Sequence, residues 1–436
     1  MLRSPCTITW HRLTEPSTST VNPLRRAKSL SPSRARAIQQ RALAKAAEFG
    51  PAEVFLRRAV VLGAEFEGVN LLTIDEILRN ALAVRVHLDG CVGLACSSML
   101  SHESEIGELV ACARRAARNG PIVKNILAPV ESSPRVLPPH EASLPEQLQS
   151  NVNQLVSELP SWAQRSVLWS GRLEQVSTMT RIIHSGGLDA TGGRSAWRLR
   201  LRARRPAGSM PVDRLLEFVA VTWAEIVEAV KTRVAGEFPQ DESVSDSPNN
   251  IPVAFGATLV AKILAAILSR RDTPPPSVPV NDLRIDDVPA GGRFGCDDEG
   301  IPLRPIAVIA SGAWCPPWCT VTEAGSSAPT GRAVRASIDM PPRPGALGLR
   351  YSGRTGERFE RFILLTELAG LSLRSDGMLV GTAPEGILIE NSRPLRRCKG
   401  RSICLPVGEI FGARFAGASA STFLTGPHRL PSVILN

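Results

Sequence analysis

The stretch that most constrains the fold is residues 281–305, NDLRIDDVPAGGRFGCDDEGIPLRP, the densest run of turn-forming and acidic residues in the chain. Leu283 and Ile285 alternate with Arg284 as in a strand, and the Asp, Pro and Gly residues that follow end that strand. A charged loop comes next, before apolar Ile301. It consists of Asp297, Asp298, Glu299 and Gly300. Three consecutive carboxylates repel one another, so the fold must either solvate them or hold them with basic or backbone donors.

Two interpretations of this acidic loop remain open. In the first, it is a solvated turn whose glycines allow positive φ. In the second, it faces a partner or a peptide, and its loss affects more than solubility. The candidate partner-binding or peptide-binding residues are then Asp297, Asp298, Glu299 and Gly300.

The length of 436 residues predicts two or three domains. Residues 1–33 are basic, rich in Ser and Pro, and lack an apolar period, so we expect a disordered extension. The rest divides into an N-terminal α/β sheet domain, a mixed middle domain and a β-rich, barrel-like C-terminal domain, at residues 34–133, 134–250 and 251–436. The expected class is α+β.

Composition limits the environment and the partners. The formal charge is +10, but much of the excess lies near the N-terminus. Nine cysteines without a C-x-x-C pair favour reduced thiols in the cytoplasm over a disulfide framework. The apolar run 259–268 is too short to span a bilayer and contains Lys262, so we expect no membrane insertion.

Patterns in the N-terminal domain predict helices packed on a sheet. A helix is expected over 34–49, with Ser33 as its N-cap, and another over 102–118. Residues 52–62 and 63–72 are expected to be successive strands. A hairpin over 81–96 is expected to turn at Asp89 and Gly90.

The middle domain is expected to begin with a helix over 144–159. A hairpin over 166–183, turning near Ser170 and Gly171, and a strand over 194–203 follow. The amphipathic segment 211–234 predicts a helix, and the acidic, Ser-rich segment 240–250 predicts a loop.

The C-terminal domain begins with an expected strand over 251–255 and a helix over 258–270. Short strands with closely spaced turns then favour a barrel or a sandwich. They are expected at 306–309, 334–338, 347–351, 361–366, 371–373, 386–389 and 432–435.

Several segments resemble those of the TldD/PmbA family. They are LRIDDVPAGGRFGCDDEGIPLRP, ALAVRVHLDGCVGLACSSML, APTGRAVR, PEGILIENSRPLRR and the final PSVILN. The resemblance covers nearly everything after the N-terminal extension and rests on ordered weak motifs rather than on one strong motif. It implies a metallopeptidase-related protein that acts on unfolded peptides.

The zinc motif of the TldD branch is missing from this sequence. That branch resembles a zinc peptidase with H-E-x-x-x-H on the helix before the acidic loop, where two histidines share a metal and the glutamate polarises its water. Residues 258–268, TLVAKILAAIL, contain no His, Cys or carboxylate. The chain therefore resembles the PmbA (TldE) branch, which implies no catalytic residue, metal ligand or cofactor in this chain. Zinc is expected in a TldD-type partner subunit, and activity only in the hetero-oligomer.

Other candidate sites lack essential members. His140 and His102 each precede a Glu but have no second His at ligand spacing, and Cys315 and Cys319 have no second ligand pair. No G-x-S-x-G, phosphate-binding or dinucleotide motif is present.

The alternative function is a basic regulator associated with nucleic acid or DNA gyrase, because the family is also named for modulation of gyrase. An aromatic content of 5% does not favour this alternative, since stacking residues are scarce.

Overall fold

The computed structural model describes most of the chain after residue 30. The described ranges are 31–98, 103–123, 126–130, 145–163, 167–204, 213–220, 222–237, 241–245, 251–268, 283–289, 293–311, 313–315, 318–324, 328–335, 337–353, 360–391, 393–410, 415–425 and 428–435. Most of the predicted N-terminal extension, and the His102 and His140 candidates, lie outside them.

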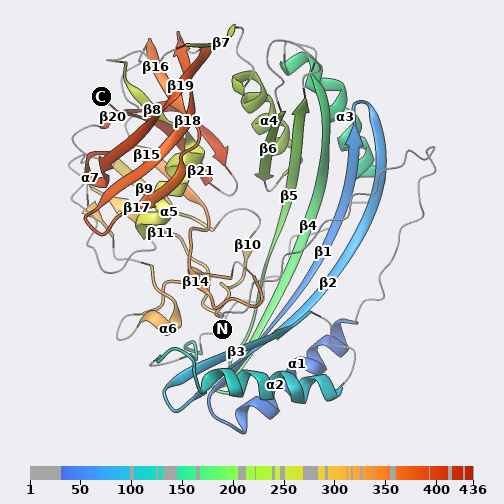
Figure 1. Ribbon diagram of the computed structural model, residues 1–436. Coiled ribbons are helices and arrows are strands. Elements are labelled where there is room, and N and C mark those ends of the chain that lie inside the picture. The colour runs from blue at the N-terminus through green and yellow to red at the C-terminus, as the bar shows by residue number, and fades with distance from the viewer. Residues whose placement is uncertain are drawn as a thin grey trace, which may run out of the picture.

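A long, curved antiparallel sheet forms one side of the molecule (Figure 1). Its order is β10-β5-β4-β1-β2-β3, with β6 also paired to β5. The strands are β1 (Ala52–Glu67), β2 (Asn70–Leu88), β3 (Cys91–Ser97), β4 (Leu168–His184), β5 (Asp189–Arg204), β6 (Asp213–Ala220) and β10 (Arg293–Phe294). Strands from both sides of the predicted 133/134 boundary share this sheet, and β10 brings the C-terminal half into it.

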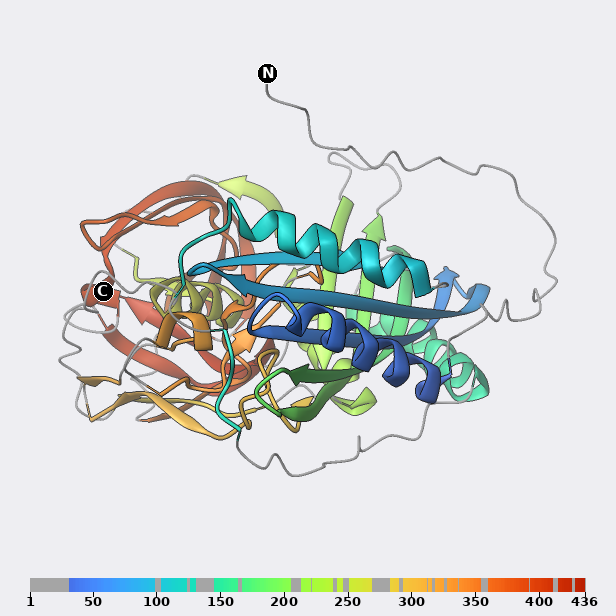
Figure 2. The ribbon, with the colours of Figure 1, turned by 90° about the horizontal axis from the view of Figure 1, so that it is seen from below.

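Four helices cover one face of this sheet. They are α1 (Pro32–Ala47), α2 (Glu103–Ala117), α3 (Pro145–Ala163) and α4 (Trp223–Glu237). Because side chains alternate along a strand, β1 shows which face is covered. Val54 and Leu56 pack with α1 and α2, whereas Ala64 and Phe66, on the same face, pack with α3 and α4. From below, α1 and α2 lie side by side across one end of the sheet (Figure 2).

The opposite face of the sheet contacts the C-terminal half of the chain. Phe55 of β1 and Ile182 of β4 pack there against Cys296, Ile301 and Val321. The two halves therefore meet here, on the face that the helices leave uncovered, and the C-terminal half also contacts β6 and α4 through residues Phe415–Thr425.

The C-terminal half is built on a second, mixed sheet of twelve strands, ordered β12-β11-β9-β15-β21-β8-β16-β18-β19-β7, with β17 on β18 and β20 on β21. Its strands are β7 (Asp241–Ser245), β8 (Val253–Phe255), β9 (Leu283–Asp287), β11 (Ile306–Ala310), β12 (Ala313–Trp314), β15 (Leu349–Gly353), β16 (Arg361–Leu365), β17 (Ala369–Leu373), β18 (Met378–Glu390), β19 (Arg393–Pro406), β20 (Phe415–Thr425) and β21 (His428–Leu435). A separate two-stranded sheet joins β13 (Ala333–Val334) to β14 (Arg343–Pro344).

The α+β class is confirmed, but the barrel-like form expected for the C-terminal half is corrected. Among the described strands the second sheet stays open, because its order ends at the short strands β12 and β7 without a pairing between them. Short strands with close turns predict many pairings, but closure depends on the register between distant strands.

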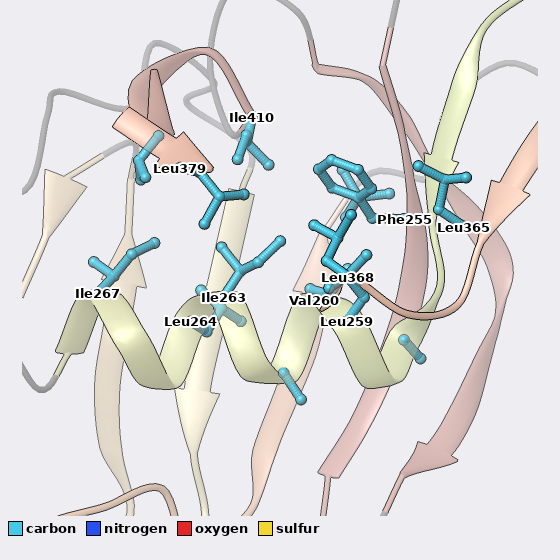
Figure 3. Packing of buried hydrophobic residues seen from close by; sticks show 14 of the residues in the cluster. Phe255, Leu259, Val260, Ile263, Leu264, Ile267, Leu365, Leu368, Leu379 and Ile410 are labelled. Atoms are coloured by element: carbon cyan, nitrogen blue, oxygen red, sulfur yellow. The ribbon is translucent and has the colours of Figure 1, made fainter. Parts of the chain in front are cut away.

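The helix α5 (Ala257–Leu268) supplies the core of the C-terminal half (Figure 3). Ile263 and Leu264 are fully buried, and Lys262 is exposed. Figure 3 shows the helix beneath Leu379 and Ile410, the latter from α7 (Val407–Ile410). Another short helix, α6 (Val321–Ala324), lies near the junction with the first sheet. Within the described residues, no helix is both long and apolar enough to cross a membrane.

Several predicted boundaries in the N-terminal half are wrong. The strands expected over 52–62 and 63–72 are one strand, β1, and the chain turns only at Gly68, whose φ is 57°. The hairpin at Asp89 and Gly90 is confirmed, and both residues have positive φ. The first helix begins earlier than expected, at Pro32. Ser31 rather than Ser33 caps it, because proline suits the first helical position.

The middle segment differs from its prediction in three places. The expected hairpin near Ser170 and Gly171 is absent, since β4 runs unbroken through both residues and pairs along its length with β1 and β5. Residues 213–220, expected to be helical, form β6 because β5 offers a free edge there. The segment 241–245, expected to be a loop, forms β7 on β19.

Candidate functional site

The acidic loop of residues 297–300 lies at the junction between the two halves of the molecule. It follows β10 and packs over the uncovered face of the first sheet near Phe55. Asp297, Asp298 and Glu299 are 2%, 8% and 0% exposed, so the solvated-turn interpretation is wrong. The expectation that basic or backbone donors hold these carboxylates is confirmed by the following contacts.

Asp297 organises the loop itself. Its Oδ1 accepts hydrogen bonds from the backbone N–H groups of Glu299 and Ile301, at 2.9 and 3.0 Å. Its Oδ2 accepts from the N–H of Ala333 at 2.9 Å, which links the loop to β13. Burial raises the pKa of Asp297 to about 8, the charge of Glu299 adds to the rise, and the three amide donors only partly offset it.

Glu299 connects the loop to the first sheet. Its Oε1 accepts from Arg85 Nη1 at 3.3 Å, and its Oε2 accepts from the N–H of Val321 at 2.6 Å. Burial raises the pKa of Glu299, and the adjacent Arg85 guanidinium opposes that rise. The side chain thus joins β2 to the start of α6.

Glu53 of β1 is shared by two arginines. Its Oε2 accepts from Arg85 Nη2 at 2.8 Å, and its Oε1 accepts from Arg335 Nη2 at 3.0 Å. Arg85 also donates to the carbonyl of Ile126 at 3.0 Å. Because Arg85 belongs to the first sheet and Arg335 to the C-terminal half, Glu53 is a bridge between the halves.

Asp298 completes the arrangement. Its Oδ2 accepts from the backbone N–H of Arg335 at 2.7 Å and lies 3.6 Å from Arg57 Nη2. The Arg335 guanidinium lies 4.7 Å from the centroid of the Phe55 ring, and that of Arg57 lies 5.3 Å from it. We call these residues the interdomain charge cluster: Glu53, Arg57, Arg85, Asp298, Glu299 and Arg335.

The interdomain charge cluster has three guanidinium groups and three carboxylates, so its charges balance. Asp297 is an additional carboxylate beside this balanced set, so the charge of Glu299 adds to the rise in its pKa that burial causes. Removing a buried member such as Arg85 leaves its partners buried with less compensation, and that is far more costly than losing an exposed pair.

Gly300 ends the loop in a conformation that favours glycine, with φ of 88°. A Cβ at this position would lie 2.5 Å from Cδ2 of Leu188, a buried side chain that packs with Phe55 and Ile301. The positive φ therefore favours glycine here, and a larger residue would also have to displace the Leu188 methyl group.

A second buried pair lies at the start of the same stretch. Asp287, at the end of β9, accepts from Arg332 Nε and from the backbone N–H groups of Leu347 and Gly348, the latter two at 3.0 and 2.6 Å. Arg332 also donates to the carbonyls of Asp287 and Arg304. This pair fixes the base of the acidic loop within the C-terminal half.

His184 lies at the same end of the first sheet and is 2% exposed. Its Nε2 lies 3.0 Å from the carbonyl of Ala128, and its Nδ1 accepts from the N–H of Gly186 at 3.0 Å. This geometry needs the neutral tautomer with its proton on Nε2, and burial lowers the pKa in agreement. Both ring nitrogens are therefore already engaged in structural contacts.

The chemistry of this site is limited because its carboxylates are buried and already hydrogen-bonded. Every carboxylate of the acidic loop already accepts from an arginine or a backbone amide, and nearly all of them are shielded from water. No group of three or more His, Cys, Asp or Glu side chains with metal-binding geometry occurs among the described residues. The arrangement suits a fixed joint between two halves. The partner-binding or peptide-binding role of Asp297, Asp298, Glu299 and Gly300 stays a prediction.

Other candidates from the sequence are also placed by the structure. Cys319 is buried and its Sγ donates to the carbonyl of Ala328 at 3.3 Å, whereas Cys315 is partly exposed and pairs through its backbone with Val308. Neither forms a disulfide, and all the cysteines within the described ranges are free thiols.

Sequence reasoning missed the basic members of the cluster and Glu53. A usable signal was present for two of them, because Arg85 stands between Val84 and Val86, and Glu53 between Ala52 and Val54. A charged residue within a run of buried apolar neighbours needs a buried partner. Nothing in the sequence indicates that Arg335, more than two hundred residues away, is that partner.

Comparisons with known proteins identify the fold. No family model and no curated protein sequence matches the chain. Among solved structures, TldE from Thermococcus kodakarensis matches with a TM-score of 0.74 and 16% identity, over 92% of this chain and 98% of that protein.

Two further crystal structures agree with this match. A candidate modulator of DNA gyrase from Thermotoga maritima has a TM-score of 0.68 and 14% identity, over 92% of this chain and 98% of that one. Another candidate gyrase modulator, from Bacteroides thetaiotaomicron, has a TM-score of 0.69 and 14% identity, over 93% of this chain and 98% of that one. The chain therefore has the fold of TldE and of these two proteins, as the sequence resemblance implied.

Proposed function

We propose that this chain is the TldE-like, non-zinc subunit of a cytoplasmic TldD/TldE-type metallopeptidase complex that processes or degrades unfolded peptides. The observation that carries the proposal is the likeness to TldE along 92% of the chain, together with the order of family-like segments in the sequence. In this proposal the chain shapes the substrate cavity and holds an extended peptide, while a TldD-type partner supplies zinc.

The residues of α5 support the division of labour. This helix stands where the TldD branch has H-E-x-x-x-H, yet it presents Val260, Ile263, Leu264 and Ile267 to the core. Aliphatic side chains offer no ligand atom, so this helix does not fit a zinc ion. The apolar face instead packs the second sheet, and the chemistry of hydrolysis is assigned to the partner.

The interdomain charge cluster supports a holding role. A substrate cavity between two halves keeps its shape only if their relative position is fixed, and buried ion pairs with backbone donors restrict that position strongly. An extended peptide can then bind through backbone hydrogen bonds, which tolerate varied sequences.

The first experiment measures zinc by elemental analysis after desalting. We expect no stoichiometric zinc in this chain alone. One zinc per chain that survives desalting would overturn the assignment to the non-zinc branch.

The second experiment assays cleavage of an unstructured peptide by this protein alone, by a zinc-motif TldD-type partner alone and by both together. We expect robust cleavage only in the mixture, and loss of that cleavage with a chelator. Cleavage by this protein alone that persists through chelator and contaminant controls would contradict the proposal.

A second candidate function is regulation of DNA gyrase or association with nucleic acid. Two structures with the same fold carry the name of candidate gyrase modulators, and this chain has a formal charge of +10. Salt-dependent retention on DNA, compared between the full chain and a chain beginning at Ser31, tests it. Retention that survives the truncation would favour this candidate over peptide binding.

A further inference from the structure

The strand β5 carries a row of arginines on one face. Its odd-numbered residues Trp197, Leu199, Leu201 and Ala203 are buried in the core with α3 and α4. Because side chains alternate, the even-numbered residues lie on the opposite face, which these helices leave uncovered. We call five of them the arginine ladder: Arg194, Arg198, Arg200, Arg202 and Arg204.

The arginine ladder is accessible to solvent. Arg194, Arg200, Arg202 and Arg204 are exposed, and the side chains of Arg198 and Arg200 are 37% and 53% exposed. Long cationic side chains in this state reach a partner without the cost of opening a buried contact.

Three carboxylates near the ladder contact an arginine of the adjacent strand β4. Arg172, on this adjacent strand, contacts Glu65, Asp75 and Glu174 at 3.0, 2.8 and 2.8 Å. Glu174 is therefore held closely by Arg172 and lies 3.8 Å from Arg198.

One further carboxylate, Glu217 of β6, contacts Arg200 at 3.0 Å and is itself 58% exposed. Asp213 lies opposite Arg204 in the β5–β6 register. Among the described side chains on this face of β4, β5 and β6, Arg172 and the five ladder arginines outnumber the carboxylates of Glu174 and Glu217, even when Glu65 and Asp75 beside Arg172 are added. The potential beside β5 therefore favours an anionic partner.

The spacing of the ladder matches an extended polypeptide. Alternate residues of a strand repeat at roughly 6.8 Å, and an extended peptide lying along β5 has the same repeat. Acidic side chains at alternate positions of such a peptide can therefore meet successive arginines, each through a charge-assisted hydrogen bond.

The same face is poorly suited to single-stranded nucleic acid. Such ligands need aromatic side chains on which bases stack. The aromatic residue of β5, Trp197, lies in the core on the other face, and between Arg194 and Arg198 the ladder face carries Ala196, opposite Val176 of β4.

We propose that the arginine ladder binds extended polypeptides rich in Asp and Glu, so that the chain selects acidic peptide segments. This inference rests on the proposed peptide-holding function and names its substrate class. The ladder begins at Arg194, where Arg293 of β10 pairs with β5. A peptide bound along it therefore runs from β10, beside the acidic loop, toward β6 (Figure 1).

The test measures binding of fluorescent, unstructured peptides to the full chain by fluorescence anisotropy. Residues 194–204 span about 34 Å, so peptides of about twelve residues suffice. The acidic probe alternates Glu with Ser, and a neutral probe replaces each Glu by Gln. The variant carries Arg200→Gln, Arg202→Gln and Arg204→Gln.

A matched control removes the same charge elsewhere. It carries Arg284→Gln, Arg361→Gln and Arg374→Gln, whose side chains are 59%, 47% and 60% exposed and each contact a carboxylate. Circular dichroism and thermal unfolding confirm that both variants fold as the wild-type chain does.

We expect the acidic probe to bind more tightly than the neutral probe, and to lose about tenfold or more in affinity in the ladder variant but not in the control. The preference should also weaken with salt. Equal binding of both probes, or equal losses of affinity in the two variants, would overturn the inference. The proposed peptide-holding function would still stand if the neutral probe binds.

Two other outcomes would also overturn the inference. Ladder-dependent binding of a single-stranded oligonucleotide that exceeds binding of the acidic probe would assign the face to nucleic acid. Failure of the chain to bind any peptide, alone or with its partner, would remove the proposed function as well.

Discussion

The interdomain charge cluster and the arginine ladder use the same residue type in opposite ways. Arg85 and Arg335 are almost fully buried, and each contacts carboxylates and carbonyls that fix one geometry. Arg200 is more than half exposed, and its carboxylate partner Glu217 is exposed as well. A buried guanidinium without its partner is very costly, so it maintains structure, whereas an exposed one can exchange partners at little cost.

The largest loss of unfolding free energy is expected for Arg85→Met in the interdomain charge cluster. This change leaves Glu53 and Glu299 buried with fewer donors, so the free energy of unfolding should fall by about 3–5 kcal/mol. Urea denaturation followed by circular dichroism measures it.

The matched control is Arg172→Met on the same sheet. Arg172 contacts three carboxylates, against two for Arg85, but its side chain is 19% exposed and water can solvate the acids it leaves. We expect a loss of about 1 kcal/mol. Equal losses for the two variants would show that burial does not distinguish the two arginine environments.

Gly300→Ala tests the geometry of the acidic loop. The positive φ and the contact with Leu188 should together cost about 2–3 kcal/mol in unfolding free energy. Gly377→Ala is the control, since Gly377 has φ of 80° but nothing within 4 Å of the position that an alanine methyl group would take. We expect about 1 kcal/mol there. A smaller loss at Gly300 than at Gly377 would contradict tight packing of the loop.

The titration of Asp297 should give a pH-dependent effect on the free energy of unfolding. Because burial raises its pKa to about 8 in the folded chain, against about 3.9 unfolded, the folded state binds the extra proton between those values. Its contribution to stability is therefore present at low pH and is lost as pH rises from about 4 to about 8.

The comparison is with Asp297→Asn, which lacks this titration. The wild-type advantage in unfolding free energy should shrink with rising pH, by no more than about 1.4 kcal/mol per pH unit. Denaturation curves at several pH values between about 5 and about 8 measure it, and a constant or growing advantage would refute the raised pKa.

The smallest stability effect is expected for the ladder itself. Arg200→Gln should change the free energy of unfolding by about 0.5 kcal/mol or less, because its partner Glu217 is exposed. Thermal unfolding measures this change. A loss comparable to that of Arg85→Met would mean that the ladder is structural and not a binding surface.

Much of the fold could be predicted from local patterns. The helices near 103–117 and 145–163, the hairpin at Asp89 and Gly90, and the apolar helix α5 follow from periodicity and turn chemistry. Errors occurred where long strands pass through turn-like residues, as β4 does at Ser170 and Gly171. Pairing on both sides of a strand overrides the local preference of those residues.

The candidate site could be predicted only in part. The clustering of Asp297, Asp298 and Glu299 was evident, and their need for donors followed from charge repulsion. The partners of these carboxylates were not evident, because Arg85 and Glu53 come from strands more than two hundred residues earlier. No periodicity links positions at that separation.

The sequence by itself determined the residue types that limit the chemistry: an apolar helix without metal ligands, an acidic loop ending in glycine, and an alternating arginine strand. Tertiary structure decided which charges are buried and which are exposed. The physical reason is that a carboxylate or guanidinium is tolerated in the interior only with a partner at hydrogen-bonding distance. Only the docking of the C-terminal half onto the uncovered face of the first sheet brings Glu53, Glu299 and Arg335 to that distance.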